Sequence, residues 1–86
     1  MSPLTIRATI LRVLAASKPF AVPAETLLSE VNRLVRPALT AEQLREHLTW
    51  MLDRSMIDFL PDDLAPDDVD ARRWHIREAG LAALRG

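Results

Sequence analysis

The 86-residue sequence contains no cysteine, only two glycines and no long apolar run. Without cysteine, disulfides, iron–sulfur clusters and thiol chemistry are excluded, which fits a reducing compartment. No stretch reaches the roughly 18 apolar residues of a membrane span. The N-terminus also lacks the basic and apolar segments of a secretory signal. These absences indicate a soluble cytoplasmic protein with no membrane partner.

An overall excess of positive charge is missing as well. The formal net charge of -1 provides no global attraction to nucleic acid. The charges are nevertheless unevenly distributed, because residues 1–57 carry seven basic and five acidic side chains, whereas residues 58–86 carry four basic and seven acidic ones. Residues 1–57 are therefore the part whose charge suits an anionic partner. Ten of the eleven basic residues are arginine, which, with the high alanine content, is typical of GC-rich bacterial genomes.

The sequence lacks the motifs of catalysis and of metal binding. Glycine occurs only at positions 80 and 86, and no Walker motif or glycine-rich phosphate loop is present. His47 and His75 have no carboxylate at ligand spacing, so ordinary solvated or hydrogen-bonded histidines are expected instead of a metal site or general base. The aspartates of residues 62–70 do not follow the calcium-loop pattern, and a solvated acidic loop is expected. We therefore expect no catalytic residue, metal, cofactor or enzymatic activity.

The most strongly specified segment is residues 39–60, LTAEQLREHLTWMLDRSMIDFL. Thr40 and Gln43 predict a capping box at a helix start, and Leu39 and Leu44 predict a hydrophobic staple. Apolar residues then recur at helical spacing at Leu44, Leu48, Met51 and Leu52. A helix over residues 40–54 is therefore predicted, followed almost directly by a strand over residues 56–60.

Two helices are predicted before this segment. Ser2 and Pro3 suit the N-cap and N1 positions of the first, which ends near Ala16. After a short extended segment over residues 20–22, Pro23 is predicted at N1 of a second helix that Pro37 ends. The predicted buried faces are Ile6, Ile10, Val13 and Leu14 in the first helix and Leu27, Leu28, Val31, Leu34 and Val35 in the second.

A hairpin and a short helix are predicted after it. Residues 61–70 contain two prolines and five aspartates, which predicts a loop. Residues 71–77 form a second strand with Trp74 and Ile76 on its inner face, paired with residues 56–60. Residues 78–84 predict a terminal helix that Gly80 weakens, so this helix needs docking. The predicted core is Ile10, Leu14, Leu28, Val31, Leu44, Leu48, Leu52 and Ile76.

This order of elements resembles the winged helix-turn-helix family. Residues 44–57, LREHLTWMLDRSMI, are similar to the family's third helix entering its wing strand. Residues 74–84, WHIREAGLAAL, are similar to the segment that leaves the second wing strand and starts a terminal helix. The resemblance implies an α+β fold over residues 1–86: one winged-helix domain with a three-helix core, a short β-hairpin wing and a short C-terminal helix.

The resemblance also implies double-stranded DNA as the partner and a role in transcriptional regulation. In DNA-binding members the third helix enters the major groove, where its exposed residues meet bases and phosphates. The candidate contact residues are Thr40, Gln43, Arg45, Glu46, Thr49, Trp50 and Arg54, with Arg72 and Arg73 in the wing. Because few of these are cationic, DNA binding requires a homodimer or additional contacts from Arg7, Arg12, Arg33 and Arg36.

Three features depart from the DNA-binding pattern. The third helix has only Arg45 and Arg54 against three carboxylates, the wing tip carries five aspartates, and Ser55 stands where glycine often ends the helix. These departures favour an alternative function, a protein-interaction module that uses the acidic wing and Trp50. Trp50 has two interpretations: an exposed ring that meets the partner, or a ring packed as partial core.

Overall fold

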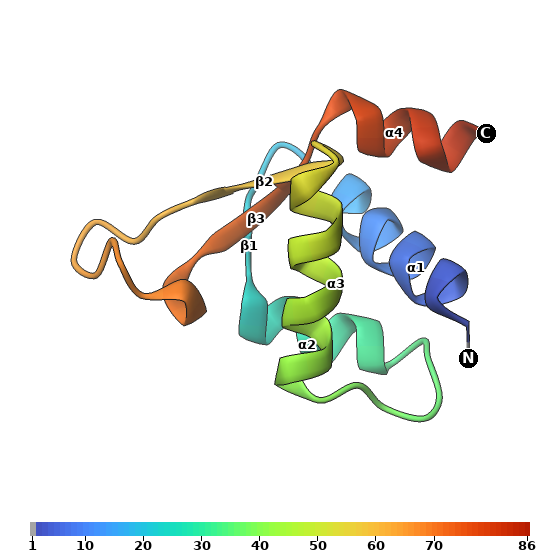
Figure 1. Ribbon diagram of the computed structural model, residues 1–86, viewed down its shortest axis with the longest axis horizontal. Coiled ribbons are helices and arrows are strands. Elements are labelled where there is room, and N and C mark those ends of the chain that lie inside the picture. The colour runs from blue at the N-terminus through green and yellow to red at the C-terminus, as the bar shows by residue number, and fades with distance from the viewer. Residues whose placement is uncertain (1) are drawn as a thin grey trace.

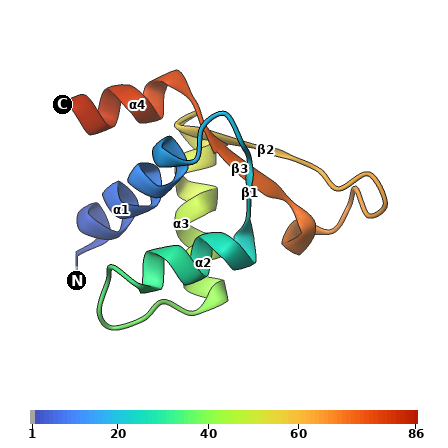
Figure 2. The same ribbon diagram turned by 180° about the vertical axis from the view of Figure 1, so that it is seen from behind.

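The computed structural model describes residues 2–86, which form a small α+β fold with four α-helices and a three-stranded antiparallel sheet (Figure 1). The elements are α1 (Pro3–Ala16), β1 (Val22–Pro23), α2 (Ala24–Asn32), α3 (Ala41–Asp53), β2 (Ile57–Leu60), the 3₁₀ helix η1 (Val69–Ala71), β3 (Arg73–Ile76) and α4 (Glu78–Arg85). The β2–β3 hairpin extends away from the helices, whereas α1 and α4 lie side by side at the opposite end (Figures 1 and 2).

Both predicted helix starts with a side-chain cap are confirmed. The Ser2 hydroxyl accepts a hydrogen bond from the Thr5 N–H at 3.3 Å and caps α1. At the start of α3, the Thr40 hydroxyl accepts from the Gln43 N–H at 3.1 Å, and the Gln43 side-chain oxygen accepts from the Thr40 N–H at 3.0 Å. These reciprocal bonds satisfy two backbone donors that the helix itself leaves unpaired, and they fix where α3 begins.

The predicted hairpin is also confirmed, and a third strand joins it. β2 pairs with β3 along its whole length in antiparallel register. β1 pairs with the other edge of β3, where Val22 lies opposite Trp74 and Pro23 lies opposite Arg73. Pro23 was predicted as the first helical residue, but its extended backbone (φ -59°, ψ 148°) places it in the strand and makes it the N-cap residue of α2.

α2 ends earlier than the sequence predicts. The last helical residue is Asn32, not a residue next to Pro37. The Asn32 side chain holds the following loop, because its amide nitrogen donates to the Leu39 carbonyl at 3.1 Å and its oxygen accepts from the Leu39 N–H at 2.8 Å. Leu34, predicted to be buried, therefore lies in a turn and is 65% exposed, whereas Val35 beside it is buried.

The hydrophobic core joins the inner faces of α1, α2 and α3 to the sheet. Six of the eight predicted core residues are buried, whereas Leu28 and Leu52 are half-buried at the margin. At 100° per residue, each of these two leucines lies roughly 70–80° from the centre of its helix's apolar stripe. Trp74 and Ile76 are buried on the inner face of β3, as the strand alternation predicts. Further core residues are Leu27, Met51 and Ile57.

The C-terminus of α3 turns through a left-handed residue. Ser55 has φ 58°, a conformation in which a Cβ atom is unfavourable and which glycine adopts readily. The Met56 N–H donates to the Met51 carbonyl at 3.0 Å, and the Ser55 N–H donates to the Leu52 carbonyl at 3.0 Å. These two bonds form a Schellman motif, which ends the helix and directs the chain into β2.

Replacing Ser55 with glycine should therefore stabilise the protein by about 1 kcal/mol, because left-handed backbone costs a residue with a Cβ atom about that much. Thermal melting should show the midpoint rising by about 4–8 °C for a domain of this size. Ser29→Gly is the matched control, since Ser29 is exposed inside α2. The control should melt lower, because glycine weakens a helix interior. A midpoint for Ser55→Gly at or below that of the natural protein would contradict this turn.

Candidate interaction surface

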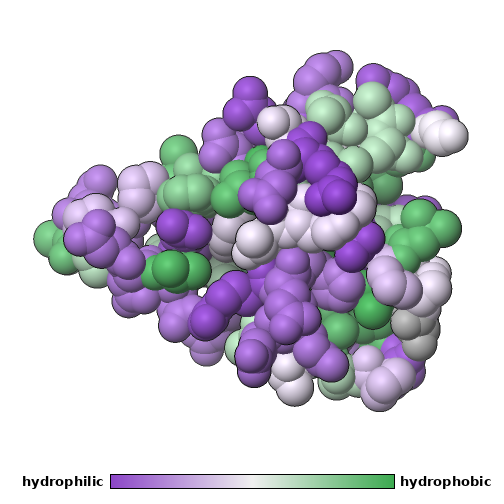
Figure 3. Space-filling view, viewed as in Figure 1, coloured by the Kyte–Doolittle hydropathy of each residue, from purple (hydrophilic) through white to green (hydrophobic). Residues whose placement is uncertain are grey.

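The exposed surface of α3 is divided lengthwise into three stripes. At 100° per residue, Glu42, Glu46 and Asp53 lie within roughly 40° of one another along its middle, and all three are exposed. We call these three residues the acidic stripe. Gln43, His47, Trp50 and Arg54 flank it on the α1 side, and Arg45 and Thr49 flank it on the wing side. The space-filling view shows that hydrophilic residues cover this face of α3 (Figure 3).

On the wing side, Arg45 is already paired. Its Nη2 atom lies 2.6 Å from Oδ1 of Asp70 in η1. Asp68 holds η1 in place, because its side chain accepts a hydrogen bond from the Asp70 N–H at 3.0 Å. Both charged groups of the Arg45–Asp70 pair are mostly exposed, so the pair adds at most about 1 kcal/mol of stability. The pair nevertheless neutralises the positive charge of Arg45, the arginine on the wing side of α3.

The other predicted contact residues of α3 differ in whether their side chains already form hydrogen bonds within the protein. Thr40 and Gln43 bond each other in the capping box, so part of their hydrogen-bonding capacity is used inside the helix. Glu46 and Thr49 are exposed and form no side-chain hydrogen bond with another of residues 2–86. All four residues are exposed. In Thr40 and Gln43 the capping bonds and a partner would compete for the same atoms, whereas Glu46 and Thr49 have no such competing bond.

The two predicted wing arginines also differ. Arg72 is half-buried and lies along the wing, with its guanidinium carbon 3.9 Å from the centroid of the Phe59 ring. The Phe59 ring in turn packs against Trp74, with the ring centroids 5.5 Å apart. Arg73 is exposed on the opposite face of β3. Arg72 therefore helps to hold the wing together, whereas Arg73 is free to meet a partner.

On the α1 side, Trp50 lies between two arginines. The guanidinium carbon of Arg7, from α1, lies 3.7 Å from the ring centroid, and that of Arg54 lies 3.6 Å from it. Arg54 also donates a hydrogen bond to the Trp50 carbonyl at 3.1 Å. The ring is half-buried and packs at the margin of the core. Trp50 therefore packs as partial core, and the ring stays half-exposed beside two arginines.

His47 lies beside this cluster and contacts the same arginine. The Nε atom of Arg7 donates a hydrogen bond to Nδ1 of His47 at 3.3 Å, which requires Nδ1 to be unprotonated. Burial, followed by the positive charge of Arg7, lowers the pKa of His47 below its ordinary value of 6.5, and Glu46 opposes the change. The neutral imidazole is therefore the form that the fold accommodates.

The lowered pKa of His47 makes stability depend on pH in a defined window. The unfolded chain binds a proton at His47 near pH 6.5, whereas the folded protein does so only at lower pH. Between these values the unfolded state binds more protons, so the free energy of unfolding should fall as the pH falls, and the loss should level off below the folded pKa.

Urea unfolding of the natural protein and of His47→Gln across this range measures the effect, because the carboxylates titrate in both. As the pH is lowered, the free energy of unfolding of the natural protein should fall more than that of His47→Gln. Parallel pH profiles would contradict the expected titration of His47, and an NMR titration of its imidazole resonances measures the pKa directly.

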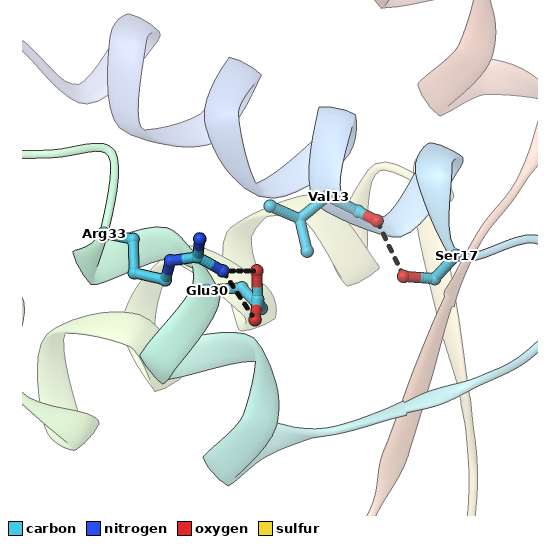
Figure 4. Close-up of polar contacts among 4 residues, drawn as sticks. All are labelled: Val13, Ser17, Glu30 and Arg33. Atoms are coloured by element: carbon cyan, nitrogen blue, oxygen red, sulfur yellow. Dashed lines mark hydrogen bonds and ion pairs between the residues drawn. The ribbon is translucent and has the colours of Figure 1, made fainter.

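The arginines that follow α2 are engaged within the fold. Arg33 pairs with Glu30 at 3.2 Å, one helical turn away (Figure 4). Figure 4 also shows the Ser17 hydroxyl bonded to the Val13 carbonyl at the end of α1. Arg36 donates to backbone carbonyls at the end of α2. Of the four additional arginines considered from the sequence, only Arg12 is exposed and forms no ion pair, cation–π contact or side-chain hydrogen bond among residues 2–86.

A groove of about 260 Å³ lies beside the Arg45–Asp70 pair, between α2, α3 and the base of the wing. Its walls are mainly apolar and include Leu28, Leu48 and Trp74. Within residues 2–86, no group of three or more histidine, aspartate or glutamate residues is placed to hold a metal ion. No helix in that range is both long and apolar enough to cross a membrane.

Comparison with protein-family models, with curated proteins and with solved structures finds no match to this chain. Only the side chains described above bear on its function. They provide an acidic stripe on α3, a paired arginine on one side of it, and an arginine–tryptophan cluster on the other.

Proposed function

We propose that this chain is a winged-helix-type domain that binds a positively charged protein partner through α3 and the wing. The order of helices and strands and the hairpin beside α3 agree with that architecture. The acidic stripe of Glu42, Glu46 and Asp53 carries the proposal, because it occupies the middle of the face that a winged helix presents. No catalytic role is part of the proposal.

The same charges oppose the approach of a DNA duplex. Arg45 is paired with Asp70, and the wing tip adds the exposed or half-exposed carboxylates of Asp62, Asp63, Asp67 and Asp68. Affinity for DNA depends on phosphates neutralised by cations, with a slope in log salt of about -0.9 per contact. A face with few free cations gains little from this term. A cationic protein segment instead meets complementary charge along the acidic stripe and at the wing tip.

A titration with a lysine-rich peptide, followed by the backbone amide resonances in NMR spectra, tests the protein-partner proposal. The resonances of Glu42, Glu46 and Asp53 should shift together, and the shifts should weaken as salt screens the charges. The triple variant E42Q/E46Q/D53N should lose them. Glu78→Gln, which removes an exposed carboxylate from α4, should leave them intact. Shifts that persist in the triple variant would place the interaction elsewhere and contradict the proposal.

Double-stranded DNA is the second candidate partner, and the α1 side of α3 favours it. Arg7 and Arg54 stack on Trp50, and neither lies within 4.0 Å of a carboxylate in the described part of the chain. Arg12 adds a third cation on the exposed surface of α1. A duplex that approached from this side would meet these arginines and largely avoid the acidic stripe.

Fluorescence anisotropy with a labelled mixed-sequence duplex, at low and at physiological salt, separates the two candidates. The protein-partner proposal expects no binding even at low salt. The DNA candidate expects binding that weakens steeply with salt and that Arg54→Ala reduces. Arg45→Ala is the comparison variant, because Asp70 already neutralises that arginine. A larger effect of Arg45→Ala than of Arg54→Ala would mean that the wing releases Arg45 to the duplex.

A further inference from the structure

A second apolar groove lies at the end of the molecule opposite the wing, between α1 and α4. It encloses about 190 Å³, space for one aliphatic side chain. Its lining is Leu4, Arg7, Ala8, Leu11, Trp50, Met56, Ala83 and Leu84. Leu4, at the start of α1, is 78% exposed. Leu4 and the apolar lining of the groove thus form one continuous apolar surface, and apolar surfaces rimmed by polar residues are typical of interaction sites.

The rim of this groove is cationic. Arg7 is among its lining residues, beside Trp50. Arg54 does not line the groove but stacks on the same Trp50 ring, which brings a second cation close to it. Arg12 lines the continuation of the groove past Leu4. None of these three arginines forms an ion pair with a carboxylate of residues 2–86. The groove therefore suits an apolar side chain that is flanked by carboxylates.

The wing tip has this chemistry. Leu64 is 96% exposed and stands between Asp62-Asp63 and Asp67-Asp68. A tight turn presents it, because the Asp62 side chain accepts from the Leu64 N–H at 2.8 Å and the Asp62 carbonyl accepts from the Ala65 N–H at 3.2 Å. Figure 3 shows a hydrophobic residue at the far end of the wing among hydrophilic neighbours.

We propose that this protein self-associates by placing Leu64 of one copy in the α1–α4 groove of a second copy, with the flanking aspartates against the arginines of the rim. The proposal goes beyond the proposed function and does not rest on it. The tip and the groove lie at opposite ends of a molecule whose longest dimension is 35 Å, so the tip cannot fill its own groove (Figures 1 and 2). The hairpin projects from the helices, so the tip is accessible to a neighbouring copy (Figure 1).

The area that one loop tip buries is below the roughly 1,200 Å² of a stable interface, so each contact is weak and reversible. Two reciprocal contacts close a dimer, whereas single contacts in one direction extend a chain. Because carboxylates meet arginines at the rim, the association should weaken as salt shortens the Debye length from about 10 Å at 0.1 M to about 3 Å at 1 M.

Sedimentation velocity over a wide range of protein concentration, at about 0.1 M and about 1 M salt, measures the association. The natural protein should associate more as concentration rises and less at high salt. Leu64→Ser should weaken the association about tenfold or more, because a buried leucine contributes on that scale. Leu34→Ser is the matched control, since Leu34 is also exposed but lies outside both surfaces, and it should behave as the natural protein.

Mixing two variants tests the pairing of tip and groove. The groove variant L4S/R12E changes two exposed side chains, so the fold should be retained, and melting curves verify this. This variant and L64S, each alone, should associate more weakly than the natural protein by about tenfold or more. An equimolar mixture should form more complex than either alone, through the intact groove of one and the intact tip of the other. A groove variant that associates normally would indicate tip-to-tip contact, and a normal L64S would indicate groove-to-groove contact. Either result, or a natural protein that stays monomeric throughout, would overturn the proposal.

Discussion

Replacing Leu48 with alanine should lower the free energy of unfolding by about 2–5 kcal/mol. Leu48 is 2% exposed and lies at the centre of the apolar stripe of α3, facing the core. Truncation removes the transfer free energy of the buried methyl groups and leaves a space that the closely packed interior fills only partly. A single domain is stable by about 5–15 kcal/mol, so this loss is a large fraction of the total.

Urea unfolding followed by circular dichroism measures the change. Leu64→Ala is the matched control, because it removes the same atoms from a side chain that is 96% exposed, and it should alter the stability by less than about 0.5 kcal/mol. An unchanged unfolding midpoint for Leu48→Ala would mean that α3 does not pack against the core through this face.

The elements that the sequence predicted best are those whose local signals agree with their burial. α1 and α3 begin directly after the N-cap residues Ser2 and Thr40, because side-chain caps act over three residues, a distance that sequence spacing specifies directly. The end of α2 was predicted wrongly because it depends on the bonds between Asn32 and Leu39, which form only when the loop folds back. Leu34 has the apolar spacing of a helical residue, but it lies beyond the end of α2 and is therefore not buried.

The candidate site depends even more on contacts between residues that are distant in the chain, which sequence spacing does not predict. Residue types on α3 identified which side chains could meet a partner, but not which of them other elements already hold. Asp70 reaches Arg45 from 25 positions along the chain, and Arg7 reaches Trp50 from another helix. Both contacts depend on how the wing and α1 pack beside α3, and no spacing rule within one helix predicts them. These contacts decide which arginines remain available.

Gly80 shows how a local rule and tertiary packing can oppose each other. Helix propensity identifies it as the weak point of α4. In the folded protein it is buried in the first turn of α4, next to Met56 and Ile76. A Cβ atom at this position would overlap the Met56 carbonyl oxygen and lie 2.7 Å from Cγ1 of Ile76. The Met56 carbonyl is fixed in place, because it accepts a hydrogen bond from the Arg77 N–H at 2.9 Å.

Gly80→Ala should therefore destabilise the protein by about 1–3 kcal/mol through overpacking, although alanine favours a helix over glycine by about 1 kcal/mol. The melting midpoint should fall by about 4–8 °C for each kcal/mol lost. Ala82→Gly makes the reverse exchange at an exposed position of α4, and only propensity acts there, so it should cost about 1 kcal/mol. A Gly80→Ala protein that melts above the natural one would show that propensity dominates and that α4 does not dock closely against Met56 and Ile76. Close docking requires that Gly80→Ala and Ala82→Gly both lower the melting midpoint. Helix propensity alone would raise the midpoint for the first exchange and lower it for the second.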